Sequence, residues 1–394
     1  MPDMLSEALD LNEYTRFLRR DFHRHPELGF QEVRTAGVVT RTLTELGLEV
    51  TPGIGKTGVV ALLEGKQPGP VVMLRFDMDA LPIVEENSVE YASENTGVMH
   101  ACGHDAHTAV GLTVARLLHN HRQEINGTVK FVFQPAEEGL GGAEGMIAAG
   151  VLDNPKPNFA LGVHVWNEKP LGWVGISPGA VMAAADIFRV RITGMGGHGA
   201  VPNLSIDPVV ASVQVINALQ SIVSRNVAPL QSAVVSVTTI HGGEAFNVIP
   251  PSVELKGTIR AFEPEVHAKV LRRFEEIING VSTAMGCKVE FEITVITPAV
   301  INDPDVTKRF QASAAHVLPH EQLDTGFRTM GSEDFAYFSQ QVPGCYIMIG
   351  SANPEKGLDA PHHHPRFDID EGVLPKAVAL VAGAALDLLK SQDH

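Results

Sequence analysis

The residues of this chain best suited to chemistry are a cysteine, two histidines and a pair of glutamates. Cys102-Gly-His104 precedes a segment with helical periodicity, Glu137-Glu138 follows a short apolar run, and His164 lies at the end of another. Thiolate, imidazole and carboxylate groups all bind zinc-like ions. A second carboxylate beside such ligands can act as a general base toward an activated water. The combination predicts a hydrolytic metal site.

Each of these groups also has an ordinary structural explanation. Cys102 fits a buried apolar cysteine, and His164 fits a histidine satisfied in the core or on the surface. Adjacent glutamates usually mark a solvated face, but Glu137 and Glu138 lie in Gln134–Gly142, a segment rich in helix-breaking residues. That context favours a functional loop. The presence of all the groups in one chain favours the metal site.

Two aspartates follow a further apolar run and suit a supporting role. Asp77 and Asp79 come directly after Val71–Phe76. An aspartate that accepts the outer N–H of a ligating histidine fixes the tautomer of that histidine. We expect one aspartate to point at the site and the other to make structural bonds. A capped turn before Pro82 would explain the pair equally well.

The segments that must position these groups alternate between helix and strand. The patterns predict helices over 14–22, 32–46 and 106–121, the last with Asp105 as its N-cap, and strands over 58–63, 71–76, 129–133 and 159–165. Helices that alternate with continuous apolar strands indicate an α/β fold, a mixed, mainly parallel sheet covered by helices. In such sheets functional loops gather at the carboxyl ends of the strands, so the candidate ligands can converge.

The middle of the chain has a different pattern. It predicts strands over 187–193, 233–240, 252–261 and 288–295, and helices over 207–226 and 264–285. This order, β-α-β-β-α-β, is typical of a ferredoxin-like α+β domain. We therefore expect a first domain over 1–182 and 297–394, interrupted by a second domain over 183–296.

Composition and charge exclude several classes of function. A net charge of −16 without a basic stripe argues against a nucleic-acid partner. No apolar run is long enough for a transmembrane helix, which argues against a membrane partner. The odd number of well-separated cysteines favours a reducing compartment. Because Met1–Ala8 also lacks the basic and apolar regions of a signal peptide, we expect a cytoplasmic protein.

A set of motifs spread over nearly the whole chain carries a family resemblance. They are Arg20-x-Phe-His-x-His-Pro-Glu27, Arg75-x-Asp-Met-Asp-Ala-Leu-Pro82, Met99-His-Ala-Cys-Gly-His-Asp105, Phe133-Gln-Pro-Ala-Glu-Glu138, Gly197-His-Gly-Ala200, Gly242-Gly-x-Ala-x-Asn-Val-Ile-Pro250, Met330-Gly-Ser-Glu-Asp-Phe335 and His363-His-Pro-x-Phe-Asp368. In order and spacing the chain resembles the hippurate hydrolase and N-acyl-L-amino-acid amidohydrolase branch of the aminoacylase-like (carboxypeptidase G-like) dinuclear metallopeptidases.

The resemblance implies two divalent metal ions per subunit, with zinc, manganese, cobalt and nickel all compatible with the ligand types. By motif position the ligands would be Cys102, His104, Glu138, His164 and His363, with Cys102 able to bridge the ions. Glu137 would be the general base, and Asp77 and Asp79 would be supporting residues. His363 is chosen by the family pattern His-x-Pro, and the neighbouring His362 and His364 remain alternatives.

The resemblance also gives the second domain a role as a lid and dimerisation domain. His198 would reach an active site, that of the partner subunit, and polarise the substrate carbonyl. Asn247 and Arg260 would bind the scissile oxygen or the product carboxylate, for which a guanidinium fork is well suited. An exposed strand residue is the alternative for Arg260. We expect a homodimer through this domain, or a higher oligomer.

The activity implied is hydrolysis of N-acyl amino acids, acetyl, benzoyl or related, to a carboxylic acid and a free amino acid. A water activated by the metal ions would attack, with Glu137 as the base. One alternative keeps the chemistry and changes the substrate, as in a dipeptidase or carboxypeptidase of the same family. Another is a structural or metal-storage protein. Structural zinc sites are closed and usually rich in cysteine, whereas Cys102 is the one cysteine near this cluster.

Overall fold

The computed structural model describes residues 3–390, and residues 1–2 and 391–394 lie outside the described part. The chain divides into two compact units. Unit 1 consists of Met1–Val181, Val300–Arg328 and Glu333–His394, and unit 2 consists of Met182–Ala299 and Thr329–Ser332. None of the described helices combines the length and apolar character that a membrane-spanning helix requires.

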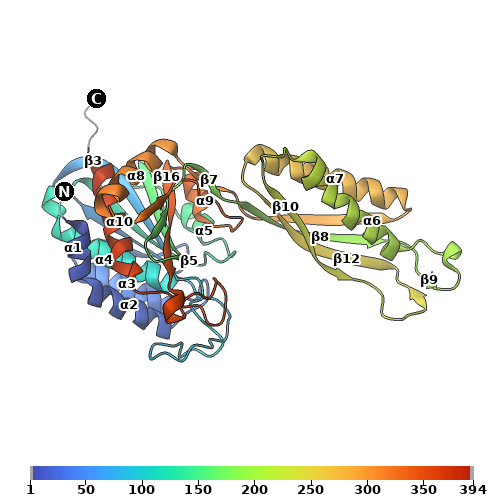
Figure 1. Ribbon diagram of the computed structural model, residues 1–394, viewed down its shortest axis with the longest axis horizontal. Helices are drawn as coiled ribbons and strands as arrows, with labels where there is room; N and C mark the ends of the chain where they lie inside the picture. The colour runs from blue at the N-terminus through green and yellow to red at the C-terminus, as the bar shows by residue number, and fades with distance from the viewer. Residues whose placement is uncertain (1–2, 391–394) are drawn as a thin grey trace. The chain divides into compact units, whose positions relative to one another are not determined.

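Unit 1 is built around a mixed, mostly parallel sheet, which confirms the expected α/β class (Figure 1). From one edge to the other, the strands of this sheet are β1 (Glu49–Ile54), β2 (Gly58–Glu64), β4 (Asn126–Gln134), β3 (Gln67–Asp77), β5 (Phe159–Pro170), β16 (Gly344–Ala352), β6 (Trp173–Gly175) and β15 (Gln322–Asp324). The four central strands, β4, β3, β5 and β16, run parallel to one another. β1 and β2 add an antiparallel edge.

Helices cover the sheet, and most of the apolar core lies on one face of it. The helices are α1 (Met4–Asp10), α2 (Asn12–Arg24), α3 (Val33–Glu45), α4 (His104–Asn120), α5 (Gly142–Ala148), α8 (Pro304–Val317), α9 (Phe335–Ser339) and α10 (Val373–Leu389). A short strand pair, β7 (Gly179–Met182) and β14 (Val300–Asn302), completes the unit. α4 and α10 are buried along nearly their whole length and pack on β3, which places them at the centre of the core.

Alternation along the central strands separates this apolar face from a polar one. Leu74 and Phe76 of β3 join the core cluster that contains α4 and α10. The residues between and after them, Arg75 and Asp77, are buried on the opposite face, because successive strand side chains point to opposite sides of a sheet. On β16, Tyr346 lies on this second face, with its ring 5.0 Å from that of Phe335 in α9. The second face therefore carries buried polar groups.

Two local expectations from the sequence are wrong, and both concern the ends of elements. α4 is capped not by Asp105 but by Gly103, which has the left-handed φ of 93°, and a Cβ there would lie 2.3 Å from Val165. β5 does not end at Val165 but continues to Pro170, because it goes on pairing with β16 beyond the end of β3. His164 therefore lies inside a strand.

Unit 2 is an antiparallel sheet with two helices (Figure 1). Its elements are β8 (Ala184–Thr193), α6 (Pro208–Ser221), a π-helical turn η3 (Ile222–Asn226), β10 (Ala233–His241), β12 (Ser252–Ala261), α7 (Pro264–Ala284) and β13 (Lys288–Thr297). The sheet order is β10-β12-β8-β13, and side chains such as Phe188 and Phe274 form a core of its own. A small ribbon, β9 (Gly197–His198) with β11 (Val248–Ile249), belongs to the same unit.

Candidate metal centre

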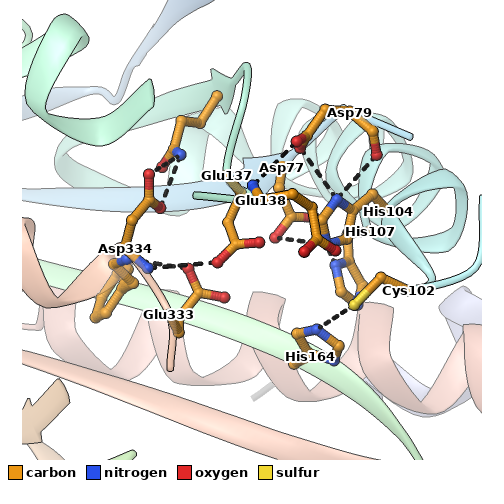
Figure 2. Close-up of polar contacts among 12 residues, drawn as sticks. Asp77, Asp79, Cys102, His104, His107, Glu137, Glu138, His164, Glu333 and Asp334 are labelled. Atoms are coloured by element: carbon orange, nitrogen blue, oxygen red, sulfur yellow. Dashed lines mark hydrogen bonds and ion pairs between the residues drawn. The ribbon is translucent and has the colours of Figure 1, made fainter. Parts of the chain in front are cut away.

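The candidate ligands Cys102, His104, Glu138, His164 and His363 all belong to unit 1 and come together in two overlapping groups. Figure 2 shows four of them, Cys102, His104, Glu138 and His164. Ligand atoms of Cys102, His104 and His164 lie within 4.8 Å of one another. Those of Cys102, Glu138 and His363 do the same. Because Cys102 is common to both groups, the thiolate could bridge two ions. The donor types, sulfur, imidazole nitrogen and carboxylate oxygen, fit divalent transition metals.

Hydrogen bonds fix the tautomers of two of these histidines. His104 Nδ1 lies 3.0 Å from the carbonyl oxygen of Asp79 and 3.1 Å from its Oδ1. His164 donates from Nδ1 to the carbonyl of Val165 at 2.6 Å. In both rings this leaves the Nε2 lone pair available for a metal ion. The Nε2 of His164 is 3.5 Å from Cys102 Sγ, and the buried Nε2 of His104 has no hydrogen-bond partner within residues 3–390.

Of two other histidines near the cluster, His107 has both ring nitrogens occupied, whereas His362 has a partner on Nε2 and a buried Nδ1 without one in the described residues. The N–H of Val165 donates to His107 Nε2 at 2.9 Å, and His107 Nδ1 bonds Asp77 Oδ1 at 2.6 Å. The N–H of Asn167 donates to His362 Nε2 at 3.2 Å. His363, the candidate of the His-x-Pro pattern, points its Nε2 at Glu138 Oε1, 3.2 Å away. His363, and not His362, groups its ligand atom with those of Cys102 and Glu138, which favours His363 as the candidate.

The two supporting aspartates have different partners. Asp79 accepts from His104, and its Oδ2 also accepts the backbone N–H of Glu138 at 3.1 Å. Asp77 bonds His107 and accepts from Arg75 Nη1 at 2.6 Å. Asp79 thus supports a candidate ligand directly, whereas Asp77 joins a buried network behind the ligands.

A second acidic cluster surrounds Glu137, and the sequence pattern alone did not identify it. Arg75 Nη2 lies 2.8 Å from Glu333 Oε1 and 2.9 Å from Asp334 Oδ1. Tyr346 donates its hydroxyl proton to Glu333 Oε2 at 2.5 Å. Glu333 and Asp334 are therefore held by hydrogen bonds next to Glu137, as Figure 2 shows. His107 was also missed, although its place three residues after His104 puts both on one helix face.

The centre brings a thiol and several carboxyl groups together, and this suits a cation. Burial raises the pKa of the Cys102 thiol well above its usual range, and the carboxylates of Glu138 and Glu137 raise it further. Burial likewise raises the pKa of Glu137, with Glu333 and Glu138 adding to the rise. Divalent cations would neutralise these charges and deprotonate the thiol. A carboxylate with a raised pKa is also suited to accept a proton.

The other candidate residues lie on unit 2. His198 is exposed on β9, pairs with Val248 of β11 and accepts the N–H of Ala200 on Nδ1 at 3.0 Å. Asn247 directly precedes β11, so the ribbon brings it close to His198. Arg260 lies on β12, part-buried, and donates to Ser332 Oγ at 2.8 Å. It is therefore not simply an exposed strand residue.

Comparison with known proteins gives consistent matches along the chain. The family described as peptidase family M20/M25/M40 matches residues 73–387. N-acetylcysteine deacetylase of Bacillus subtilis (strain 168) is 40% identical over 95% of this chain and 96% of its own length. Thermostable carboxypeptidase 2 of Saccharolobus solfataricus is 38% identical over 94% of each chain. The crystal structure of Bacillus subtilis YXEP, described as a dinuclear metal binding peptidase, covers 97% of this chain and 99% of its own, with 35% identity and a TM-score of 0.85.

Proposed function

Since the chain belongs to peptidase family M20/M25/M40 and is a metal-dependent hydrolase of amide bonds with a two-metal centre, we propose that it cleaves N-acyl amino acids to a carboxylic acid and a free amino acid. Similarity to a deacetylase of an N-acyl amino acid supports this substrate class. The observation that carries the chemistry is the buried Glu137 beside two ligand groups that share Cys102.

In this proposal Cys102, His104 and His164 would hold one ion, and Cys102, Glu138 and His363 would hold the other. Zinc, manganese, cobalt and nickel all suit these ligands. The bound ions supply Lewis acidity toward the acyl carbonyl and the attacking water. Asp79 keeps the Nε2 lone pair of His104 directed at its ion by bonding Nδ1.

Glu137 transfers protons in the proposed reaction. It accepts a proton from the attacking water and delivers one to the leaving amine. Its raised pKa and its burial suit both steps, because a carboxylate that is too acidic would hold a proton poorly. Water attack and amine departure break the amide bond and give the free acid and the amino acid.

Residues of unit 2 bind the substrate in this proposal. His198 stabilises the developing oxyanion from the partner subunit of a homodimer formed through unit 2, an electrostatic contribution of about 3 kcal/mol. Asn247 binds the scissile oxygen and Arg260 the substrate carboxylate, for which a guanidinium fork provides two parallel donors.

A carboxypeptidase activity is the second candidate, and one observation favours it. The chain is 38% identical to a thermostable carboxypeptidase over 94% of its length. The two activities share the hydrolytic chemistry and a substrate carboxylate, so they differ in what occupies the acyl side of the bond. In the first activity this side is a simple acyl group such as acetyl or benzoyl, and in the second it is a peptide.

The test is amine release from N-acetyl-, N-benzoyl- and long-chain N-acyl amino acids and from peptides. It uses metal-stripped protein before and after addition of zinc, manganese, cobalt or nickel. Metal-restored cleavage of acyl amino acids alone supports the proposal and identifies the acyl group. Cleavage of peptides alone supports the carboxypeptidase, and no cleavage with any metal overturns the substrate class.

A further inference from the structure

The loop that carries Glu137 and Glu138 begins with a backbone conformation that its residue does not favour. Ala136, the residue before them, has a φ of 53°, in the left-handed region. Residues with a Cβ rarely adopt this region. Ala136 is completely buried, and its carbonyl accepts the N–H of Gly142, which closes the loop. An unfavourable conformation at this position requires a partner that holds it.

That partner is the side chain of Glu32, which comes from a distant part of the sequence. Glu32 Oε1 accepts the N–H of Ala136 at 2.9 Å. Its Oε2 accepts from the hydroxyl of Thr57 at 2.5 Å. The Glu32 side chain is fully buried, so both carboxylate oxygens are used within the protein.

The position of Glu32 is unusual because it does not cap its own helix. Glu32 is the residue before α3, yet its side chain makes no capping bond. Glu27 does this instead, since its carboxylate accepts the N–H groups of Arg34 at 2.9 Å and Thr35 at 2.8 Å. Helix N-termini need such acceptors. With Glu27 in that role, the carboxylate of Glu32 is free to bond the loop.

The loop is also held on the other side of Glu137. Asp79 Oδ2 accepts the N–H of Glu138. Carboxylates of Glu32 and Asp79 thus bind the backbone one residue before and one residue after Glu137, and the peptide planes that direct its side chain are fixed from both sides.

We propose that Glu32 is a positioning residue for the metal centre: by holding Ala136 in the left-handed conformation, it sets the direction in which Glu137 and Glu138 leave β4. The inference rests on the proposed roles of Glu137 and Glu138. Glu32 belongs to none of the groups of candidate ligand atoms found in the described residues.

The test compares the Co²⁺ affinity of four variants with that of the wild type. Metal-stripped protein is titrated with Co²⁺, and binding is monitored through the absorption band of the bond between the Cys102 thiolate and cobalt. We expect Glu32→Ala to weaken Co²⁺ binding about 10- to 100-fold, as loss of supporting bonds around a metal site commonly does. Adding Ala136→Gly to that variant restores most of the affinity, because glycine adopts positive φ without support. Glu32→Gln keeps an oxygen acceptor for the Ala136 N–H and stays close to wild type.

The matched control is Glu27→Ala, a glutamate of the same segment that caps α3 and does not touch the loop. It lowers the unfolding temperature and leaves Co²⁺ affinity unchanged. Unchanged affinity in folded Glu32→Ala overturns the proposal, and so does a double variant that recovers nothing. If Glu32→Ala alone fails to fold, recovery of a folded, Co²⁺-binding chain in the double variant supports the proposal, and no recovery overturns it. Co²⁺ affinity is read without any substrate, so an inactive wild type would overturn the proposed function alone.

Discussion

A hydrogen bond to one ring nitrogen decides which histidines of the cluster can bind a metal ion. His104 and His164 use Nδ1 for a protein carbonyl or carboxylate and keep Nε2 available. His107 has both nitrogens occupied. Residue types and spacing predict the donor types, and the choice of His104 comes from the family resemblance; spacing alone gives no reason to prefer it to His107. The distinction depends on backbone groups of β5, which only the fold brings near.

Substitution Glu137→Gln separates catalysis from metal binding. The amide cannot accept the proton of the attacking water, so we expect kcat to fall by about 10²- to 10⁴-fold. Metal content stays at two ions per subunit, because Glu137 is not among the proposed ligands. Metal analysis of the purified variant and steady-state kinetics measure both. Glu138→Gln is the control and should lose metal as well as activity. A fully active Glu137→Gln variant would show that the base is assigned wrongly.

Substitution Asp79→Ala tests the support of the ligands. Asp79 bonds both His104 Nδ1 and the N–H of Glu138, so we expect a loss of metal affinity of about 10- to 100-fold. Competition with a chelator of known affinity measures it. Asp305→Ala, an exposed aspartate on α8, is the control and should bind metal like wild type. Equal affinity in both variants would contradict the role of Asp79.

Among the elements, α2 is tied to the first turn of α4 by buried charges. Arg19 Nε lies 2.9 Å from Asp105 Oδ2. His23 lies between two carboxylates, with Nδ1 2.8 Å from Asp105 and Nε2 3.2 Å from Glu85. Because His104 precedes Asp105, these bonds anchor the turn that carries a candidate ligand. They also explain why Asp105 does not cap α4, since its carboxylate is used for α2.

This arrangement predicts a pH dependence of stability. Burial lowers the pKa of His23, but the charges of Asp105 and Glu85 outweigh it and raise the pKa from 6.5 to about 9. The folded state thus binds a proton more tightly than the unfolded state. The resulting stabilisation, about 3 kcal/mol, is fully present below pH 6.5 and is lost as the pH rises through about 9.

Urea unfolding of metal-stripped protein at pH 6, 7.5 and 9 measures this effect. We expect wild type to lose stability over this range more steeply than His23→Gln, which has no proton to lose at this position. His316→Gln is the control, because that histidine lies exposed on α8. Identical slopes for wild type and His23→Gln would contradict the prediction.

Periodicity predicts the interiors of elements better than their ends. The helices over 14–22 and 32–46 and the strands of unit 2 agree closely with the structure. The end of β5 and the start of α4 do not, because both depend on long-range contacts. β5 continues beyond Val165 by pairing with β16. The residue before α4 is Gly103, because a Cβ at this position would lie too close to the side chain of Val165. The hydrogen bond between Glu32 and Ala136 could not be predicted from the sequence either, since it joins residues 104 positions apart.

At the scale of the whole molecule, the apolar cores and the metal centre are separate. Unit 1 has its main core on the face of the sheet that carries α4 and α10, whereas Arg75, Asp77 and the acidic cluster occupy the other face. Unit 2 has its own core between sheet and helices. Burial of apolar surface is the dominant favourable contribution to folding, and neither core cluster contains a proposed ligand.

Metal removal should therefore abolish activity and preserve the fold. After chelation we expect an unchanged far-ultraviolet circular dichroism spectrum. We also expect a lower unfolding temperature for unit 1, because a ligand that binds the folded state stabilises it by mass action. The unfolding of unit 2 should not shift, since the proposed ligands all belong to unit 1. Calorimetry of the whole protein, stripped and then reloaded with metal, resolves the two contributions. Loss of the far-ultraviolet circular dichroism signal of the folded protein on chelation would instead indicate a structural metal site, because only a fold that depends on its ions unfolds without them.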